Sequence, residues 1–297
     1  LGSPSSEDGR VLLERAVTLD TTSAGAKPNG SNIILAYPVT PAPGAASTGL
    51  TVNAGQAPLG MRGVVTTGPQ HFTGAIIPRG RHATNAAPIT FDGIVLLDED
   101  FYGETTANDA SGGDIVFKEG VSSVIREGSR PKNFVIDAGT GEITFGVAVG
   151  KSIVIFFGNA GPIGDLDLTA SRLNGGAGEA SITLAGGKTL TLNLSGASSY
   201  PGVIRGSAVE LVKKGAGALT LGGANTYSGG TRVEAGRVIA GVDSDFSGGM
   251  LTAGALGTGS VSIENGATLD LNGSSVGNEL SVAGDGVHGG GALRNGG

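Results

Sequence analysis

Short runs of alternating apolar and polar residues recur along the second half of the chain. Because successive side chains of a strand point to opposite faces, each run predicts a half-buried β-strand. The runs cover residues 182–184, 190–194, 209–212, 219–221, 261–263, 269–271 and 280–282. The alternation predicts one inward ladder, which consists of Leu219, Leu221, Val233, Val238, Val261, Ile263, Leu269 and Leu271.

Glycine and asparagine separate these runs at close intervals, as at Gly222-Gly223, Gly229-Gly230 and Asn265-Gly266. Glycine reaches positive φ at little steric cost, so the chain can turn after only a few strand residues. Asn-Gly is typical of a β-hairpin, and repeated hairpins favour an antiparallel β-sandwich. Strands this short also suit the corners of a stacked β-solenoid. Both all-β architectures remain open on these grounds, and either leaves less than about a tenth of the chain for helices.

The middle of the chain continues the series of strands. We expect strands at residues 89–97, in two parts about Asp92-Gly93, and at 114–117, 121–125, 133–136, 142–145 and 152–157. Most of the phenylalanines fall in this block, and large apolar rings on inward positions predict a stack inside the fold rather than a cofactor site. The expected stack consists of Phe91, Phe101, Phe117, Phe134, Phe145, Phe156 and Phe157.

The first eighty residues are less regular. Residues 5–15 hold the only plausible helical turn, but Gly9 interrupts it, which favours an N-terminal arm or cap that becomes a strand at Ala16 to Leu19. From Thr21 to Gly80, glycine, proline and alanine dominate. Proline has no N–H to donate to a central ladder, so we expect irregular backbone or edge strands there.

Composition narrows the function classes. The chain has 297 residues with 56 glycines, and the glycines show no collagen period. It has no cysteine, which excludes disulfides and thiolate metal sites. The net charge of −7 and the absence of a basic block argue against a nucleic-acid partner. No apolar run is long enough to span a membrane. The chain begins at Leu1 and stops within its glycine pattern, so we expect a piece of a longer protein.

Searches for catalytic motifs give little. Gly187-Lys188-Thr189 resembles the end of a phosphate-binding loop, but its leading glycine and its strand-to-helix context are missing. His71, His82 and His288 lie far apart in the sequence, and we expect each to be a surface or turn histidine.

One acidic group is a stronger candidate for a functional site. Asp98, Glu99 and Asp100, with Glu104 close behind, could hold Ca²⁺ weakly or supply the carboxylate pair of a glycan-cleaving enzyme. Charges that follow a strand more commonly mark a solvated turn. Asp165 and Asp167 are expected to point outward in the same way. We therefore predict no catalytic residue, no cofactor and no metal ligand.

Residues 211–241 carry a specific pattern that resembles a known family. Its elements are Lys214, Gly215, Gly217, Leu219-Thr220-Leu221, Gly223, Asn225-Thr226-Tyr227, Gly229-Gly230-Thr231, Val233 and Ala235-Gly236. They are similar to the autotransporter-associated β-strand repeat of type V secreted passengers and other bacterial surface proteins. The resemblance implies a right-handed parallel β-helix outside the cell. It is clear over about thirty residues, loose over 165–297 and faint before that, and it favours the solenoid over the antiparallel β-sandwich.

These observations together predict three regions. Residues 1–30 form an arm or cap, 31–164 a less regular β region with the phenylalanines, and 165–297 a repeat solenoid that continues beyond the chain. We expect an exported, cell-surface, structural or adhesive protein that is not an enzyme and that associates with itself, head-to-tail or laterally. Cell-surface glycans or matrix are further expected partners. The alternative is a carbohydrate-binding or polysaccharide-cleaving β-helix, because this fold hosts such proteins.

Overall fold

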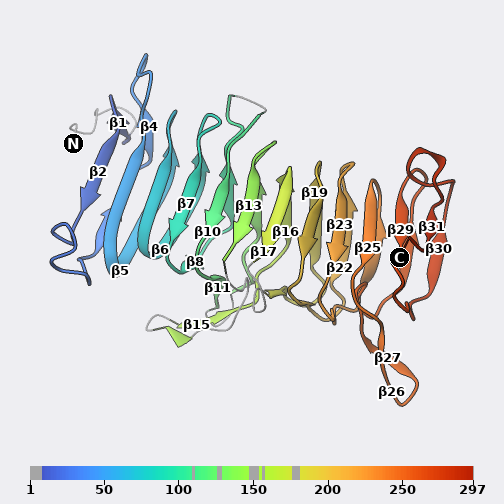
Figure 1. Ribbon diagram of the computed structural model, residues 1–297. Coiled ribbons are helices and arrows are strands. Elements are labelled where there is room, and N and C mark those ends of the chain that lie inside the picture. The colour runs from blue at the N-terminus through green and yellow to red at the C-terminus, as the bar shows by residue number, and fades with distance from the viewer. Residues whose placement is uncertain are drawn as a thin grey trace.

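The computed structural model describes residues 9–108, 111–125, 129–146, 154–155, 158–175 and 181–296. It is a right-handed parallel β-helix whose coils stack from the N-terminus to the C-terminus along one axis (Figure 1). One sheet of 27 strands winds around this axis, and nearly all of its pairings are parallel. The predicted β-helix is confirmed, and the antiparallel sandwich is wrong.

The coils have three faces, which we number in chain order. The first face contains β2 (Val17–Asp20), the starts of β5 (Leu50–Val65) and β6 (Gln70–Ala83), β7 (Ile89–Asp92), β10 (Ile115–Phe117), β13 (Glu142–Phe145), β17 (Arg172–Gly175), β20 (Ser198–Tyr200), β23 (Ala218–Leu221), β25 (Arg237–Ala240), β29 (Thr268–Asp270) and β31 (Leu293–Arg294).

The second face is shorter and less continuous. It contains β3 (Ile33–Leu35), the middle of β5 and β6, β8 (Val95–Leu97), β11 (Val121–Ile125), β18 (Ile182–Thr183) and β21 (Ile204–Arg205). β15 (Gly158–Gly161) pairs with β11 and with β14 (Val154–Ile155) in antiparallel fashion, so the regular winding is interrupted there.

The third face runs the length of the molecule. It contains β1 (Val11–Leu13), β4 (Val39–Pro41), the ends of β5 and β6, β9 (Phe101–Glu104), β12 (Phe134–Asp137), β16 (Leu166–Ala170), β19 (Thr189–Leu194), β22 (Glu210–Lys214), β24 (Gly230–Val233), β28 (Val261–Ile263) and β30 (Leu280–Val282).

Two smaller elements complete the chain. A hairpin of β26 (Asp245–Ser247) and β27 (Met250–Ala253) projects from the coils near the C-terminal end (Figure 1) and exposes Phe246 and Met250. A 3₁₀ turn, η1 (Val287–Gly289), is the only helical element among the described residues. Within the residues that the structure describes, no helix has the length and hydropathy that a membrane crossing requires.

The N-terminal region is more regular than the prolines predicted. β5 and β6, of 16 and 14 residues, each pass along all three faces, whereas we expected irregular or edge backbone up to Gly80. The pairing of β5 with β6 shifts register between Asn53 and Pro58, and such irregularities tolerate a proline because the ladder is already interrupted there. Within the stretch expected as an arm or cap, Val11–Leu13 is a strand that pairs with β4, and the strand expected at Ala16 to Leu19 corresponds to β2.

The interior is filled by ladders of like side chains. Phe91 and Phe117 stack with ring centroids 4.8 Å apart, and Phe145 continues the column at 5.3 Å from Phe117. Phe101 and Phe134 form a parallel column at 5.4 Å. The predicted phenylalanine stack is confirmed for these five, and the last two members, residues 156 and 157, lie outside the described residues.

The C-terminal ladder also follows the predicted alternation. Leu219 lies in register with Val238, and Val238 with Leu269, and none of the three side chains is exposed to solvent. Seven of the eight predicted inward residues are buried, and Leu271 is half-buried against the same core. The alternation therefore positions the outward residues of these coils as well.

Candidate functional site

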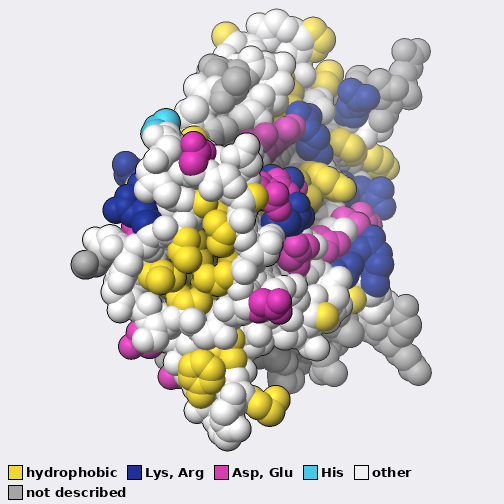
Figure 2. Space-filling model, turned by 90° about the vertical axis from the view of Figure 1, so that its right-hand side faces the viewer, with side chains coloured by type: hydrophobic (Ala, Val, Ile, Leu, Met, Phe, Trp, Pro, Cys, Tyr) yellow, Lys and Arg dark blue, Asp and Glu magenta, His cyan; other side chains and the backbone are white. Residues whose placement is uncertain are grey.

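Charged side chains are concentrated on the outer surface of the third face. Figure 2, which views the C-terminal end of the molecule, shows lysine and arginine interleaved with aspartate and glutamate down the right-hand side. We call the outer surface of β9, β12, β16, β19, β22 and β24 the charged face. It is the candidate site because five ion pairs that link one coil to the next lie on it or at its edges.

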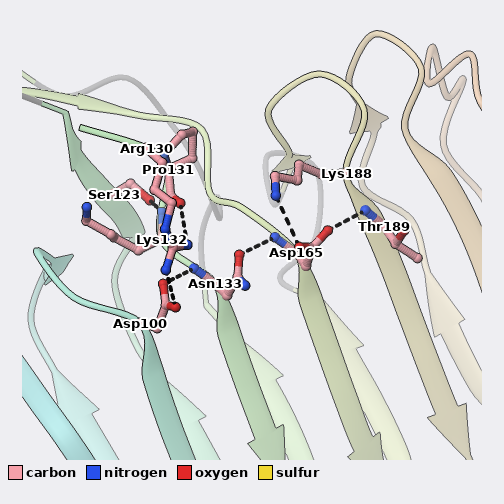
Figure 3. Close-up of polar contacts among 9 residues, drawn as sticks. All are labelled: Asp100, Ser123, Arg130, Pro131, Lys132, Asn133, Asp165, Lys188 and Thr189. Atoms are coloured by element: carbon pink, nitrogen blue, oxygen red, sulfur yellow. Dashed lines mark hydrogen bonds and ion pairs between the residues drawn. The ribbon is translucent and has the colours of Figure 1, made fainter. Parts of the chain in front are cut away.

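A ladder of side-chain oxygens runs along the N-terminal edge of this face (Figure 3). Asp100, Asn133 and Asp165 each immediately precede a strand of the face, at equivalent places on successive coils. Asp100 Oδ1 accepts the N–H of Asn133 at 3.0 Å, and Asn133 Oδ1 accepts the N–H of Asp165 at 3.0 Å. Asp165 Oδ1 accepts the N–H of Thr189 at 2.9 Å. Each side chain thus supplies the acceptor that a backbone donor at the corner needs.

Basic residues from neighbouring loops pair with the two carboxylates of this ladder. Arg130 Nη2 lies 2.5 Å from Asp100 Oδ2, and Lys188 Nζ lies 3.2 Å from Asp165 Oδ2. Partial burial raises the pKa of Asp100, but the hydrogen bonds from Arg130 and from the Asn133 N–H outweigh that effect and lower it overall. Both oxygens of Asp100 are therefore occupied by donors, and the ionised form is favoured.

The carboxylates of the predicted acidic group pair with arginines and are not gathered into one site. Arg79 donates to Asp98 from Nε, which lies 3.1 Å from both carboxylate oxygens, and from Nη2, and Glu99 lies 3.8 Å from the same Arg79 Nε. Asp100 pairs with Arg130, and Glu104 pairs with Arg81. Across the described ranges, no group of three or more histidine or acidic side chains is placed to hold a metal ion.

The rest of the charged face alternates in sign. Asp167 points outward, as predicted, and partial burial raises its pKa although Lys214 opposes that rise. Further along, Arg232 Nε lies 3.1 Å from Glu210 Oε1. Charges arranged in this way form a surface of mixed sign with many exposed hydrogen-bonding groups.

The structure corrects the expectation for one histidine. His82 has no exposed surface and lies among the rings of Phe72, Phe91 and Phe101, whereas we expected a surface or turn residue. Its position in the alternating strand β6 places it inside. His71 is partly exposed, 3.7 Å from Asp92, and His288 lies in η1.

Other residues lie in surroundings that their sequence motifs did not indicate. Lys188 pairs with Asp165 and Thr189 begins β19, so the resemblance of 187–189 to a phosphate-binding loop has no structural counterpart. Three side chains were not singled out by motif: Arg62 and Tyr102, which are exposed near the start of the charged face, and Lys213, which is completely buried. Strand alternation alone could have placed Lys213 inward, two residues after Leu211.

Comparison with known proteins identifies the repeat. Residues 211–240, from β22 through β25, match the family described as Passenger-associated-transport-repeat. The chain therefore carries an autotransporter passenger repeat. The predicted resemblance to autotransporter-associated repeats is confirmed, and the passenger repeat indicates an exported, cell-surface protein.

A curated relative supports the same interpretation. The chain is 32% identical over 203 residues to a protein of Brucella suis biovar 1 (strain 1330) named adhesin BmaC autotransporter. The match covers 65% of this chain and 5% of the adhesin, so the chain spans about a twentieth of that relative's length. No solved structure matches the chain.

Proposed function

We propose that this chain is an adhesive segment of a bacterial surface protein, and that it acts by contact through its outer faces and not by catalysis. The observation that carries the proposal is the charged face, whose paired side chains of mixed sign run over many successive coils. A rigid, filled β-helix presents such a surface with little loss of conformational freedom on binding. The similarity to a protein named as an adhesin supports the same role.

The bonding of the carboxylates supports a non-enzymatic role. A glycoside hydrolase needs an acid and a second carboxylate whose oxygens face the substrate. Here Asp100 and Asp165 lie two coils apart, and a backbone N–H from the next coil occupies one oxygen of each. Their geometry fits the connection of coils. Turnover of polygalacturonate or glucans, abolished by Asp98→Asn or Asp100→Asn, would overturn this part of the proposal.

Adhesion can be tested with the full chain on beads. Beads coated with the chain should attach to cultured epithelial cells or to extracellular matrix more than beads coated with an inert protein. Soluble chain should compete. Reversing two basic charges at the edge of the face, Arg130→Glu and Lys188→Glu, should weaken attachment while the circular dichroism spectrum stays β-rich. Attachment no greater than that of inert beads contradicts the proposal.

The proposal includes self-association and cell-surface glycans as partners. Flat strand faces with exposed polar ladders allow two β-helices to lie side by side, and mixed charges along the charged face are self-complementary. Sedimentation of the chain over a wide concentration range measures this directly. A growing weight-average mass that falls again in high salt is expected. A monomer at every concentration contradicts self-association.

A further inference from the structure

Three arginines surround a groove where the charged face begins. Arg62 of β5 and Arg79 and Arg81 of β6 line a groove of about 330 Å³, and Pro38 and Val65 contribute apolar walls. The groove is large enough for one or two sugar-sized groups, since ligand pockets begin at about 300 Å³. Its position on the outer surface leaves it open to an extended chain.

Among the described residues, one of the three groove arginines, Arg62, has no carboxylate paired with it. Arg62 and Arg79 are register partners on adjacent parallel strands, and like charges placed opposite each other repel. Arg79 pairs with Asp98 and lies 3.8 Å from Glu99, which also lines the groove, and Arg81 pairs with Glu104. Arg62 is exposed and has no acidic partner in the part of the chain that the structure describes. An anion bound beside Arg62 would relieve this repulsion.

Part of the groove's lining is backbone without side chains. Gly63 and Gly80 line the groove, and both adopt positive φ, 48° and 70°, which side-chain-bearing residues rarely adopt. The two glycines lie against each other, because a Cβ added to Gly80 would lie 3.5 Å from the Gly63 nitrogen. A ligand can therefore approach the main chain closely between the arginines.

An exposed aromatic ring lies next to this groove. Tyr102 of β9 is in register with Arg81, and 52% of its surface is exposed. A tyrosine ring offers an apolar face, on which the C–H face of a sugar packs, together with a polar hydroxyl. Guanidinium groups bind planar or tetrahedral oxyanions with paired hydrogen bonds.

We propose that this groove binds an acidic saccharide. Its carboxylate or sulfate oxygens lie against Arg62 and Arg79, and a neighbouring sugar ring packs on Tyr102. The choice of a saccharide rests on the proposed adhesive function, whereas the anion preference rests on the groove itself. The site assigns separate tasks to its residues, since Arg62 recognises charge and Tyr102 recognises the ring.

The test is titration calorimetry on the full chain with three hexasaccharides. One alternates glucuronate with N-acetylglucosamine, one is a sulfated galactan, and one is a neutral N-acetylglucosamine polymer. At least one acidic probe should bind about tenfold more tightly than the neutral one, the value of one charge-assisted contact. Which acidic probe binds distinguishes a carboxylate from a sulfate. Equal binding of all three, or binding of none, overturns the proposal.

Variants separate the two tasks. Arg62→Gln should weaken the acidic probe about tenfold and leave the neutral one unchanged, while Tyr102→Ala should weaken both. Arg205→Gln is the matched control, because Arg205 is exposed on β21 and has no ion pair among the described residues. An equal loss in Arg62→Gln and Arg205→Gln overturns the site.

The bead assay distinguishes this inference from the adhesive function. If Arg62→Gln lowers saccharide affinity and the beads still attach to cells, the groove is a saccharide site but not the main adhesive contact. If no variant changes saccharide binding while attachment persists, the groove proposal fails and adhesion stands. If saccharide binding follows the expected pattern and beads do not attach, the adhesive function fails alone.

Discussion

Asn133 and Asp165 are joined across two coils by a hydrogen bond from the Asp165 N–H to Asn133 Oδ1, 3.0 Å long. Asn133→Ala removes this acceptor from the middle of the corner ladder, so the Asp165 N–H loses its partner. We expect the free energy of unfolding to fall by about 1–2 kcal/mol, the range for an unsatisfied partly buried donor. Urea unfolding followed by circular dichroism measures the change.

A second asparagine provides the control. Asn193 points outward on β19, and its side chain makes one long contact, 3.5 Å, with Thr169. Asn193→Ala should change the free energy of unfolding by less than about 0.5 kcal/mol, as surface substitutions do. If both variants unfold at the same urea concentration as the unaltered protein, the ladder of side-chain oxygens through Asp100, Asn133 and Asp165 does not stabilise the stacked coils.

The register of β23 can be tested by one charge at adjacent positions. Leu221 is fully buried, and Leu221→Asp places an unpaired carboxylate in the core, so we expect a loss on the order of 3–5 kcal/mol. Thr220 points outward between Ser199 and Ile239, and Thr220→Asp should cost less than about 0.5 kcal/mol. Equal shifts of the urea midpoint in the two variants would refute the register.

Much of the fold could be predicted from the sequence, because apolar and polar residues alternate along a half-buried strand and show which side chains point inward. The alternation predicts the inward position of Leu219 and the outward position of Asp167, and both are confirmed. The β5 and β6 strands were missed because the prolines suggested an interrupted ladder. A proline at a register shift does not end the strand, and the shift depends on the neighbouring coil rather than on local sequence. The division into regions at residues 30 and 164 stays a prediction.

The candidate site was less accessible to sequence reasoning. Asp100 and Asp165 were noticed as acidic residues, but the ladder that joins them through Asn133 depends on the length of the intervening coils. The groove lined by Arg62 and Arg81 likewise combines strands that are adjacent only after winding. Long-range stacking decides such contacts, so composition and spacing gave no signal for them.

Lys213 provides a test of buried charge in the passenger repeat. Its ammonium group donates to the carbonyl oxygens of Lys214 at 2.5 Å and Gly215 at 2.9 Å, and its side chain has no exposed surface. Burial lowers the pKa of Lys213 to about 8. The unfolded chain keeps an ordinary lysine pKa of about 10.4 and holds the proton longer as the pH rises.

The sign of the pH effect follows from this difference. Between pH 8 and about 10 the unfolded state binds more protons at this site, so stability should rise with pH, by about 1.4 kcal/mol per unit at most. Urea unfolding at pH 7.5, 8.5 and 9.5 measures the slope. Lys213→Met should remove it, whereas Lys214→Met, at an exposed position beside Glu234, should retain it. An identical slope in the protein and in Lys213→Met contradicts the assignment.

His82 gives the complementary effect in acid. Burial lowers the pKa of His82 to about 3, and the backbone of Arg79 close by offsets only part of this effect. Its ring lies 5.4 Å from that of Phe101 and 5.7 Å from that of Phe72, between centroids, and neither ring nitrogen has a hydrogen-bond partner in the described structure. The folded protein therefore keeps this imidazole neutral at pH values where the unfolded chain protonates it.

Stability should consequently be complete above pH 6.5 and should fall as the pH decreases from 6.5 toward 3, because the unfolded state then binds the additional proton. The expected slope is about 1.4 kcal/mol per pH unit, and the window from pH 6 to 5 lies above the range in which most carboxylates titrate. His82→Phe continues the aromatic column without a titrating group, and His82→Leu does so with less volume if the larger ring overpacks the core. Urea unfolding of the protein and both variants at pH 7, 6 and 5 should show the slope only in the protein. A slope that survives in both variants would place its origin elsewhere in the fold.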